Sequence, residues 1–321
     1  MIGAAYFGSR VPRHVAADMA ALARRGFGAV LHPVGEHDLA WYRGTLPALF
    51  AASRDAGLVV AASPLTLGNL FGGEGESRFV VEHPETWQVL DSGHAVPAAC
   101  PNHPRTRAWL REFAEVVVAA GAQRVLWEEP RWAEPARFGR AGAGAWACRC
   151  DACRARFRER HGGELPAAMS DELAAFRAVC VHELLEELVA CTARLGAAPA
   201  VCAPPDDPEA WDALAALPGL DALAATPYWK ALGLPVDPCV GEAARRVAAV
   251  AGDHGVRSQL WLQAFLLEAD DAPDLARAVA LARATGVSEL WAWGFEACAA
   301  MSAMACAQPE RLWDALCAAL A

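Results

Sequence analysis

The stretch VAADMAALARRGFGAVLHPV, residues 15–34, decides the fold. Residues 15–25 carry apolar side chains at helical spacing, Gly26 suits a left-handed helix cap, and residues 29–34 form a short apolar strand. The same order of helix, glycine and strand recurs downstream, with the glycine at Gly57, Gly121 and Gly286. Repeated units in which a helix precedes a buried strand predict an α/β fold with a parallel sheet.

Eight apolar stretches fit the strand pattern. They are Ile2–Gly8, Ala29–Val34, Val59–Pro64, Arg124–Glu128, Ala198–Ala203, Ala222–Tyr228, Ser258–Phe265 and Glu289–Trp293. Eight strand–helix alternations in 321 residues predict one (β/α)8 TIM barrel over residues 1–321. The alternative is an open doubly wound sheet, which would want a glycine-rich turn after the first strand. Residues 8–12, GSRVP, lack the G-x-G-x-x-G spacing of such a turn.

Composition excludes several classes of protein. The chain is 55% hydrophobic and 21% charged, which rules out global disorder, and its net charge of −10 without a basic stripe argues against nucleic-acid binding. No signal-peptide pattern and no apolar run long enough to span a membrane is present, so we expect a cytoplasmic protein with no membrane partner. A homo-oligomer is compatible with the sequence.

Two predicted connections are longer than barrel loops need. Residues 65–104 follow the third strand, and residues 129–170 follow the fourth strand as an inserted, cysteine-containing loop module. Long loops without regular structure are usually functional or disordered. Both connections leave the carboxyl ends of strands, where the active sites of barrels lie.

The fourth-strand loop carries cysteines at metal-ligand spacing. Cys148, Cys150 and Cys153 form a C-x-C-x2-C motif, and Cys100 ends the other long loop. Four thiolates suit tetrahedral zinc in a closed, structural site. His103 and His161 compete with Cys100 for the fourth position. The other seven cysteines stand in mostly apolar segments and are interpreted as core residues.

This cysteine motif, soon after a Glu that closes the fourth strand, resembles the family 42 glycoside hydrolases. Those β-galactosidase-type barrels carry an upstream cysteine and such a triple as a zinc site. In their wider clan an Asn-Glu pair ends strand 4, with the Glu as acid/base, and a nucleophilic Glu ends strand 7. The resemblance implies a glycosidase that acts on a small glycoside, with Glu129 as general acid and Glu128 in the Asn position.

The seventh strand departs from the family pattern because Gln263 stands where the nucleophile would be. Glutamine cannot form a glycosyl ester, so the second carboxylate must come from elsewhere or the reaction must differ. Glu268 and Glu296 are the favoured candidates, and Glu74 and Glu76 in the third-strand loop are alternatives.

Aromatic and polar residues gather at the predicted strand ends. Aromatic faces stack on sugar rings while polar groups bind the hydroxyls, although half of these tryptophans are interpreted as core. The predicted substrate-binding residues are His32, Arg78, Tyr228, Trp229, Trp261, Gln263 and Trp293. Two alternatives to a glycosidase stay open, namely an isomerase or lyase that acts on a sugar-like substrate, and a non-catalytic carbohydrate-binding barrel.

Overall fold

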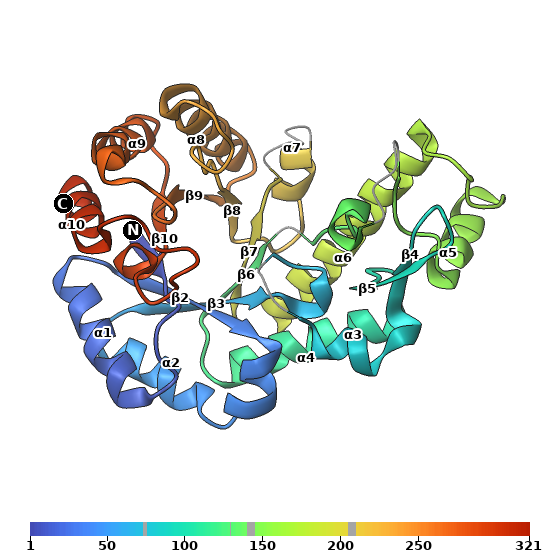
Figure 1. The fold of residues 1–321 in the computed structure, drawn as a ribbon, viewed down its shortest axis with the longest axis horizontal. Helices are drawn as coiled ribbons and strands as arrows, with labels where there is room; N and C mark the ends of the chain where they lie inside the picture. The colour runs from blue at the N-terminus through green and yellow to red at the C-terminus, as the bar shows by residue number, and fades with distance from the viewer. Residues whose placement is uncertain (73–75, 129, 140–144, 205–209) are drawn as a thin grey trace.

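The chain folds around a closed barrel of eight parallel strands, which confirms the predicted (β/α)8 architecture (Figure 1). The structure is a computed structural model that describes residues 1–72, 76–128, 130–139, 145–204 and 210–321. Around the barrel the strands run in the order β1, β10, β9, β8, β7, β6, β3 and β2. No helix in these ranges has the length and apolar character needed to cross a bilayer.

Each barrel strand corresponds to one of the eight predicted stretches. The strands are β1 (Ile2–Ala5), β2 (Ala29–Gly35), β3 (Val59–Leu65), β6 (Arg124–Glu128), β7 (Ala198–Cys202), β8 (Ala222–Ala225), β9 (Arg257–Gln263) and β10 (Glu289–Trp293). The helices that follow them are α1 (Pro12–Arg24), α2 (Leu46–Asp55), α4 (Pro104–Ala119), α6 (Asp171–Arg194), α7 (Ala210–Ala215), α8 (Val236–Asp253), α9 (Ala272–Ala284) and α10 (Pro309–Leu320).

Small residues and two tryptophans share the interior of the barrel. Alanines from β1, β2, β3, β7 and β8 face Trp261 and Trp291, whose rings stack with centroids 4.9 Å apart. Gly3 lies against the Trp291 ring so closely that an added Cβ would stand 2.4 Å from it. The backbone of β1 therefore approaches this ring in a way that only glycine allows.

A buried carboxylate closes the amino end of the barrel. Glu289 at the start of β10 is 2% exposed and accepts two hydrogen bonds from Arg124 of β6, at 2.8 and 2.9 Å. Gln259 donates to it at 2.9 Å, Trp291 donates at 3.1 Å, and an Arg257 guanidinium nitrogen lies 3.2 Å away. A buried charge this well paired ties strands from opposite sides of the barrel together.

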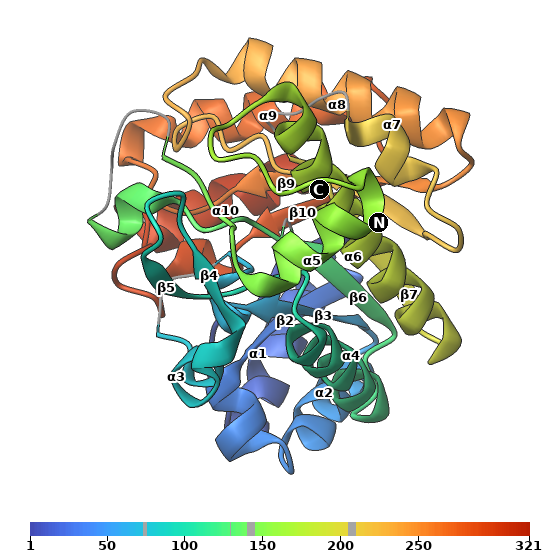
Figure 2. The same cartoon turned by 90° about the vertical axis from the view of Figure 1, so that its right-hand side faces the viewer.

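Outside the barrel, segments of the two long loops pack against each other (Figures 1 and 2). The loop after β3 contains α3 (Arg78–Glu82) and an antiparallel hairpin of β4 (Trp87–Val89) and β5 (Ala95–Ala99), and the loop after β6 contains α5 (Asp151–His161). A bridge from Leu90 to Ala147 joins the two loops. Sequence analysis did not predict the hairpin, because its strands are very short.

Removing the Glu289 carboxylate should destabilise the whole fold. In Glu289→Ala, Arg124 would stay buried without its counter-charge, and losing one partner of a buried pair costs about 3–5 kcal/mol of the free energy of unfolding. Urea denaturation followed by circular dichroism measures this change. Glu310→Ala, an exposed glutamate at the start of α10, is the control and should change stability by less than about 0.5 kcal/mol. A loss below about 1 kcal/mol in Glu289→Ala would contradict the assigned role.

Candidate functional site

Glu128 stands at the carboxyl end of β6, on the inner face of the barrel. Side chains alternate along a strand, and Leu126 lies in the interior cluster while Trp127 packs outward against Phe71 and Phe113. Glu128 is half-buried. The described barrel strands carry two carboxylates on their inner face, Glu128 at the carboxyl end and Glu289 at the amino end. Glu128 is therefore the strand carboxylate that faces the barrel mouth.

Trp127, which precedes Glu128 in the sequence, does not line this site, because its side chain belongs to the outer layer. Its indole nitrogen donates to Thr192 of α6 at 3.1 Å, and its ring is fully buried between β6 and the helices. Trp229 also packs in the outer cluster and is buried. Neither tryptophan reaches the mouth.

Other aromatic side chains do gather at the mouth. Trp293 and Tyr228 are half-buried and pack against the interior cluster, as does Phe7. The Trp293 ring lies edge-on to Phe7 at 4.7 Å and to Trp261 at 6.0 Å. Trp261 itself is buried beneath them. Trp293, Tyr228 and Phe7 thus form an apolar rim on the face where Glu128 stands.

Gln263 is held by the loop that follows β8. Its side-chain oxygen accepts hydrogen bonds from the backbone nitrogens of Lys230 and Ala231 at 3.0 and 3.3 Å, and its amide nitrogen donates to the Phe265 carbonyl at 3.0 Å. The side chain is completely buried. These contacts give Gln263 the role of fixing the loop, and they leave it no surface for a substrate.

His32 lies between the sheet and the helices rather than at the mouth. Its Nε2 atom is 2.9 Å from the Ser53 hydroxyl of α2, and its ring contacts Tyr6 and Phe50. Burial, reinforced by the positive charge of Arg10, lowers the pKa of His32 to about 3. His32 is therefore a neutral packing residue, in contrast to the expectation that it binds substrate.

The two favoured second carboxylates do not face Glu128. Glu268 is exposed and caps a short helix of residues 269–271 in a reciprocal arrangement with Asp271. Glu296 lines a small surface pocket with Arg25, the residue that follows α1, and Trp313 of α10. Partial burial and the nearby Asp18 raise the pKa of Glu296. Both carboxylates are thus placed in the outer shell of the barrel.

Arg78 and Glu36 organise the loop after β3. Arg78 is exposed and pairs with Glu82 at 2.6 Å, one helical turn along α3. Glu36, just past β2, accepts hydrogen bonds from Ser77 at 2.6 Å and from the backbone nitrogens of Gly68 and Phe79 at 3.0 and 2.7 Å. Glu36 was not predicted from the sequence, although its position directly after a strand indicates a residue at the carboxyl end of the barrel.

Two of the predicted carboxylates, Glu129 and Glu74, lie outside the described residues. Glu76 is described and exposed. Of the predicted site, the structure therefore brings Glu128, Tyr228 and Trp293 to the mouth, with Trp261 and Gln263 buried.

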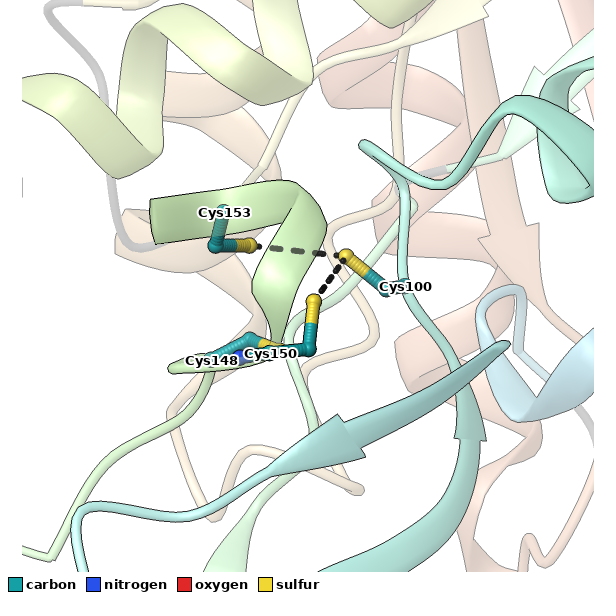
Figure 3. A group of neighbouring side chains, drawn as sticks. All are labelled: Cys100, Cys148, Cys150 and Cys153. Atoms are coloured by element: carbon teal, nitrogen blue, oxygen red, sulfur yellow. Dashed lines mark hydrogen bonds between the residues drawn. The ribbon is translucent and has the colours of Figure 1, made fainter. Parts of the chain in front are cut away.

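The four cysteines of the motif come together from both long loops (Figure 3). All are buried, and their sulfur atoms lie within 4.8 Å of one another. The Cys100 sulfur is 3.4 Å from the sulfurs of Cys150 and Cys153. The edge of a zinc–thiolate tetrahedron with 2.3 Å bonds is roughly 3.8 Å long, which is close to these separations.

Hydrogen-bond donors surround the sulfurs as they do in thiolate metal sites. The backbone nitrogen of Val89 and that of Cys150 lie 3.3 and 3.4 Å from the Cys148 sulfur, and the Asn102 amide donates to Cys153 at 3.3 Å. Burial raises the pKa of Cys100, whereas hydrogen bonds from the neighbouring thiols lower the pKa of Cys150. The cluster can thus hold a metal ion, which would favour ionisation of all four thiols.

Neither histidine that competed for the fourth position belongs to the cluster. His103 caps α4 by accepting a hydrogen bond from the Arg105 backbone nitrogen, and His161 stacks on Phe157 and pairs with Glu172. Cys100 occupies the fourth position instead.

The buried neutral state of His32 predicts a pH dependence of stability. Because its folded-state pKa of about 3 lies below the ordinary value of about 6.5, the unfolded chain binds a proton that the folded chain does not. The free energy of unfolding should therefore fall by roughly 1 kcal/mol per pH unit between about pH 6 and pH 4. Urea denaturation at several pH values should show a shallower slope in His32→Gln. His94→Gln, which removes an exposed histidine, is the control, and equal slopes in all three proteins would contradict the assignment.

The comparisons with known proteins identify the fold of this chain but not its family or its reaction. No protein-family model and no curated protein matches the chain. Among solved structures, the endo-1,4-beta-mannanase of Rhizomucor miehei aligns with a TM-score of 0.61 and 11% identity over 99% of this chain and 94% of that one. The PgaB (BpsB) glycoside hydrolase domain of Bordetella bronchiseptica aligns with a TM-score of 0.60 and 13% identity over 98% of both chains.

A barrel of another class is also similar. A D-psicose 3-epimerase aligns with a TM-score of 0.52 and 9% identity over 99% of this chain and 96% of that one. At such identities the likeness shows a shared (β/α)8 barrel, so the reaction has to be argued from the site.

Proposed function

We propose that this chain is a sugar-processing barrel enzyme of the glycoside hydrolase kind, which cleaves a small glycoside by carboxylate acid/base catalysis. The observation that carries the proposal is the position of Glu128, half-buried on the inner face of the barrel at the carboxyl end of β6. Barrel enzymes place their catalytic groups at this face. The apolar rim of Trp293, Tyr228 and Phe7 supplies surfaces on which a sugar ring can stack.

The chemistry requires one neutral and one ionised carboxyl group. Cleavage of a glycosidic bond needs a proton on the leaving oxygen while positive charge develops at the anomeric carbon. We assign the proton to Glu129, by its resemblance to the family 42 acid/base position, and the charge-stabilising role to Glu128.

The nucleophile in this proposal is not a carboxylate across the mouth. Gln263 stands at the end of β9, where the family nucleophile would be, and its side chain is hydrogen-bonded to the loop after β8. Glu268 and Glu296 lie in the outer shell of the barrel. Some glycosidases dispense with an enzyme nucleophile and use either an activated water or a group of the sugar itself. We therefore assign the attack to a neighbouring group of the substrate. Glu129, ionised after it protonates the leaving oxygen, then accepts a proton from the water that hydrolyses the intermediate.

The competing function is a carbohydrate-binding barrel without turnover. The structural role of Gln263 favours this alternative, because retaining glycosidases that use an enzyme nucleophile carry a carboxylate at that position. Turnover of any glycoside that depends on Glu128 or Glu129 would exclude this alternative.

Loss of either tandem carboxylate should abolish most of the activity. A panel of nitrophenyl glycosides identifies a substrate, and kcat is then measured for Glu129→Gln and Glu128→Gln. Removing a general acid should lower kcat by about 10²–10⁴-fold. For Glu129→Gln we also expect loss of the alkaline limb of the pH–rate profile, since that limb reports the protonated acid.

Three further variants interpret the result. Glu310→Gln removes an exposed carboxylate from α10 and serves as the matched control. Glu268→Gln and Glu296→Gln test the two outer carboxylates, and a 100-fold loss in one of them would reassign the second catalytic role. A rate unchanged in both Glu128→Gln and Glu129→Gln would overturn the proposal.

We also propose that the four-cysteine cluster holds one structural zinc ion. A buried set of four thiolates with no open coordination position suits zinc in a structural rather than a catalytic role. Four thiolates and one zinc ion carry a net charge of −2. The half-buried Arg177, whose guanidinium group stacks on Trp132 at 5.4 Å, lies close enough to Cys148 and Cys153 to interact with their charge. The ion would pin the β4–β5 hairpin to the segment that leads into α5.

Purified protein should contain about one equivalent of zinc, measured by elemental analysis after gel filtration. Cys100→Ser should lose most of it and become sensitive to proteolysis between residues 85 and 150, because metal binding is coupled to local folding. Cys239→Ser removes a half-buried thiol of α8 and should keep the zinc. Less than half an equivalent in the unaltered protein would contradict the assignment.

A further inference from the structure

We propose that Asn102 is the positioning residue of the four-cysteine cluster, and that its side chain sets how tightly the cluster holds a zinc ion. The inference rests on the proposed structural zinc, and it concerns a residue outside the set of four ligands. Asn102 lies two residues after Cys100, in the short segment between β5 and α4, and it is buried. Its contacts with sulfur atoms carry the inference.

Asn102 contacts one cysteine of the cluster from each long loop. Its backbone nitrogen donates to the Cys100 sulfur at 3.4 Å, and its side-chain nitrogen donates to the Cys153 sulfur at 3.3 Å. Cys100 belongs to the loop after β3, whereas Cys153 lies in α5 of the loop after β6. A single residue therefore supports both halves of the cluster.

The side chain of Asn102 also joins the cluster to a helix of the barrel. Its nitrogen donates to the Cys180 sulfur at 3.2 Å. Cys180 is completely buried in α6, where it packs with Phe157 and Phe176. Since α6 packs against α4, β6 and β7, it belongs to the body of the barrel. Cys180 lies outside the group of four sulfurs, so Asn102 is the link between that group and α6.

An asparagine side chain suits this position by its hydrogens and by its charge. Two hydrogens on one nitrogen serve two sulfur acceptors, and a neutral amide adds no negative charge beside the thiolates. A zinc-bound thiolate can only accept hydrogen bonds, and each one it receives stabilises its buried negative charge. Groups that hydrogen-bond to metal ligands also fix the orientation of those ligands. We therefore expect the Asn102 amide to raise the zinc affinity of the cluster.

Zinc affinity, measured by competition with a chelator, tests the inference. Asn102→Ala should weaken zinc binding by about 10–100-fold, because its side-chain hydrogen bonds to sulfur are lost while the four ligands remain. Asn102→Asp should weaken it further although the side chain keeps its shape, because a carboxylate would then face the Cys153 thiolate. A role in packing alone predicts the opposite order, with the aspartate variant closer to the unaltered protein.

Three controls separate this effect from others. Asn69, in the same long loop, donates to the Pro97 carbonyl at 2.7 Å rather than to a sulfur, so Asn69→Asp should bind zinc as tightly as the unaltered protein. Cobalt(II) absorption should keep the charge-transfer bands of a four-thiolate site in Asn102→Ala, because the ligands are unchanged. Cys180→Ala should still hold one equivalent of zinc, since Cys180 is not a ligand. Circular dichroism checks that each variant is folded.

The outcomes distinguish this inference from the zinc assignment. Zinc affinities of folded Asn102→Ala and Asn102→Asp that equal the affinity of the unaltered protein would overturn the role of Asn102 and leave the zinc in place. Tighter binding by Asn102→Asp than by Asn102→Ala would overturn it as well, since packing would then explain the loss. Unaltered protein that binds no zinc would remove the zinc assignment itself, and this inference with it.

Discussion

The ion pair between Glu289 and Arg124 sets the frame on which the rest of the molecule is built. Arg124 begins β6 and Glu289 begins β10, and these strands are separated by three others around the barrel. A charge pair across the interior fixes the level of both strands, and Gln259 and Arg257 extend the constraint to β9. Because side chains alternate strictly along each strand, this fixed level determines which residues face the mouth.

The same constraint gives the barrel two ends with different properties. At the amino end, polar groups are paired with one another and the interior is closed by charge and by stacked tryptophans. At the carboxyl end, the inner face offers a half-buried carboxylate and an aromatic rim. Stability is thus concentrated at one face, and the other is left to loops that the cysteine cluster and Glu36 hold together.

Much of the fold could be predicted from the sequence because the strand–helix rhythm is regular. The cysteine cluster could be predicted as well, since its spacing is specific and since Cys100 ends the neighbouring loop. The faces of the strands could not. Parallel strands are apolar on both sides, so the sequence does not distinguish inward residues such as Trp261 from outward ones such as Trp127 and His32.

The candidate site was harder to predict than the fold for a second reason. Gln263 and Glu268 lie at or just past the end of a strand in the sequence. In the structure, Glu268 caps a short helix and Gln263 is hydrogen-bonded to the loop after β8. Hydrogen bonds of this kind depend on tertiary geometry that no local pattern reveals. The hairpin of β4 and β5 escaped prediction because three to five residues are too few to establish an alternating pattern.

The contact of Gly3 with the Trp291 ring also has an evolutionary consequence. A larger residue at position 3 is excluded while the tryptophan is present, and a smaller residue at position 291 would leave a void beside the glycine. Neither position can drift alone without a loss of stability, although a joint exchange of bulk across the β1–β10 pair could preserve the packing. Descendants of this chain should therefore change these two residues together or keep both.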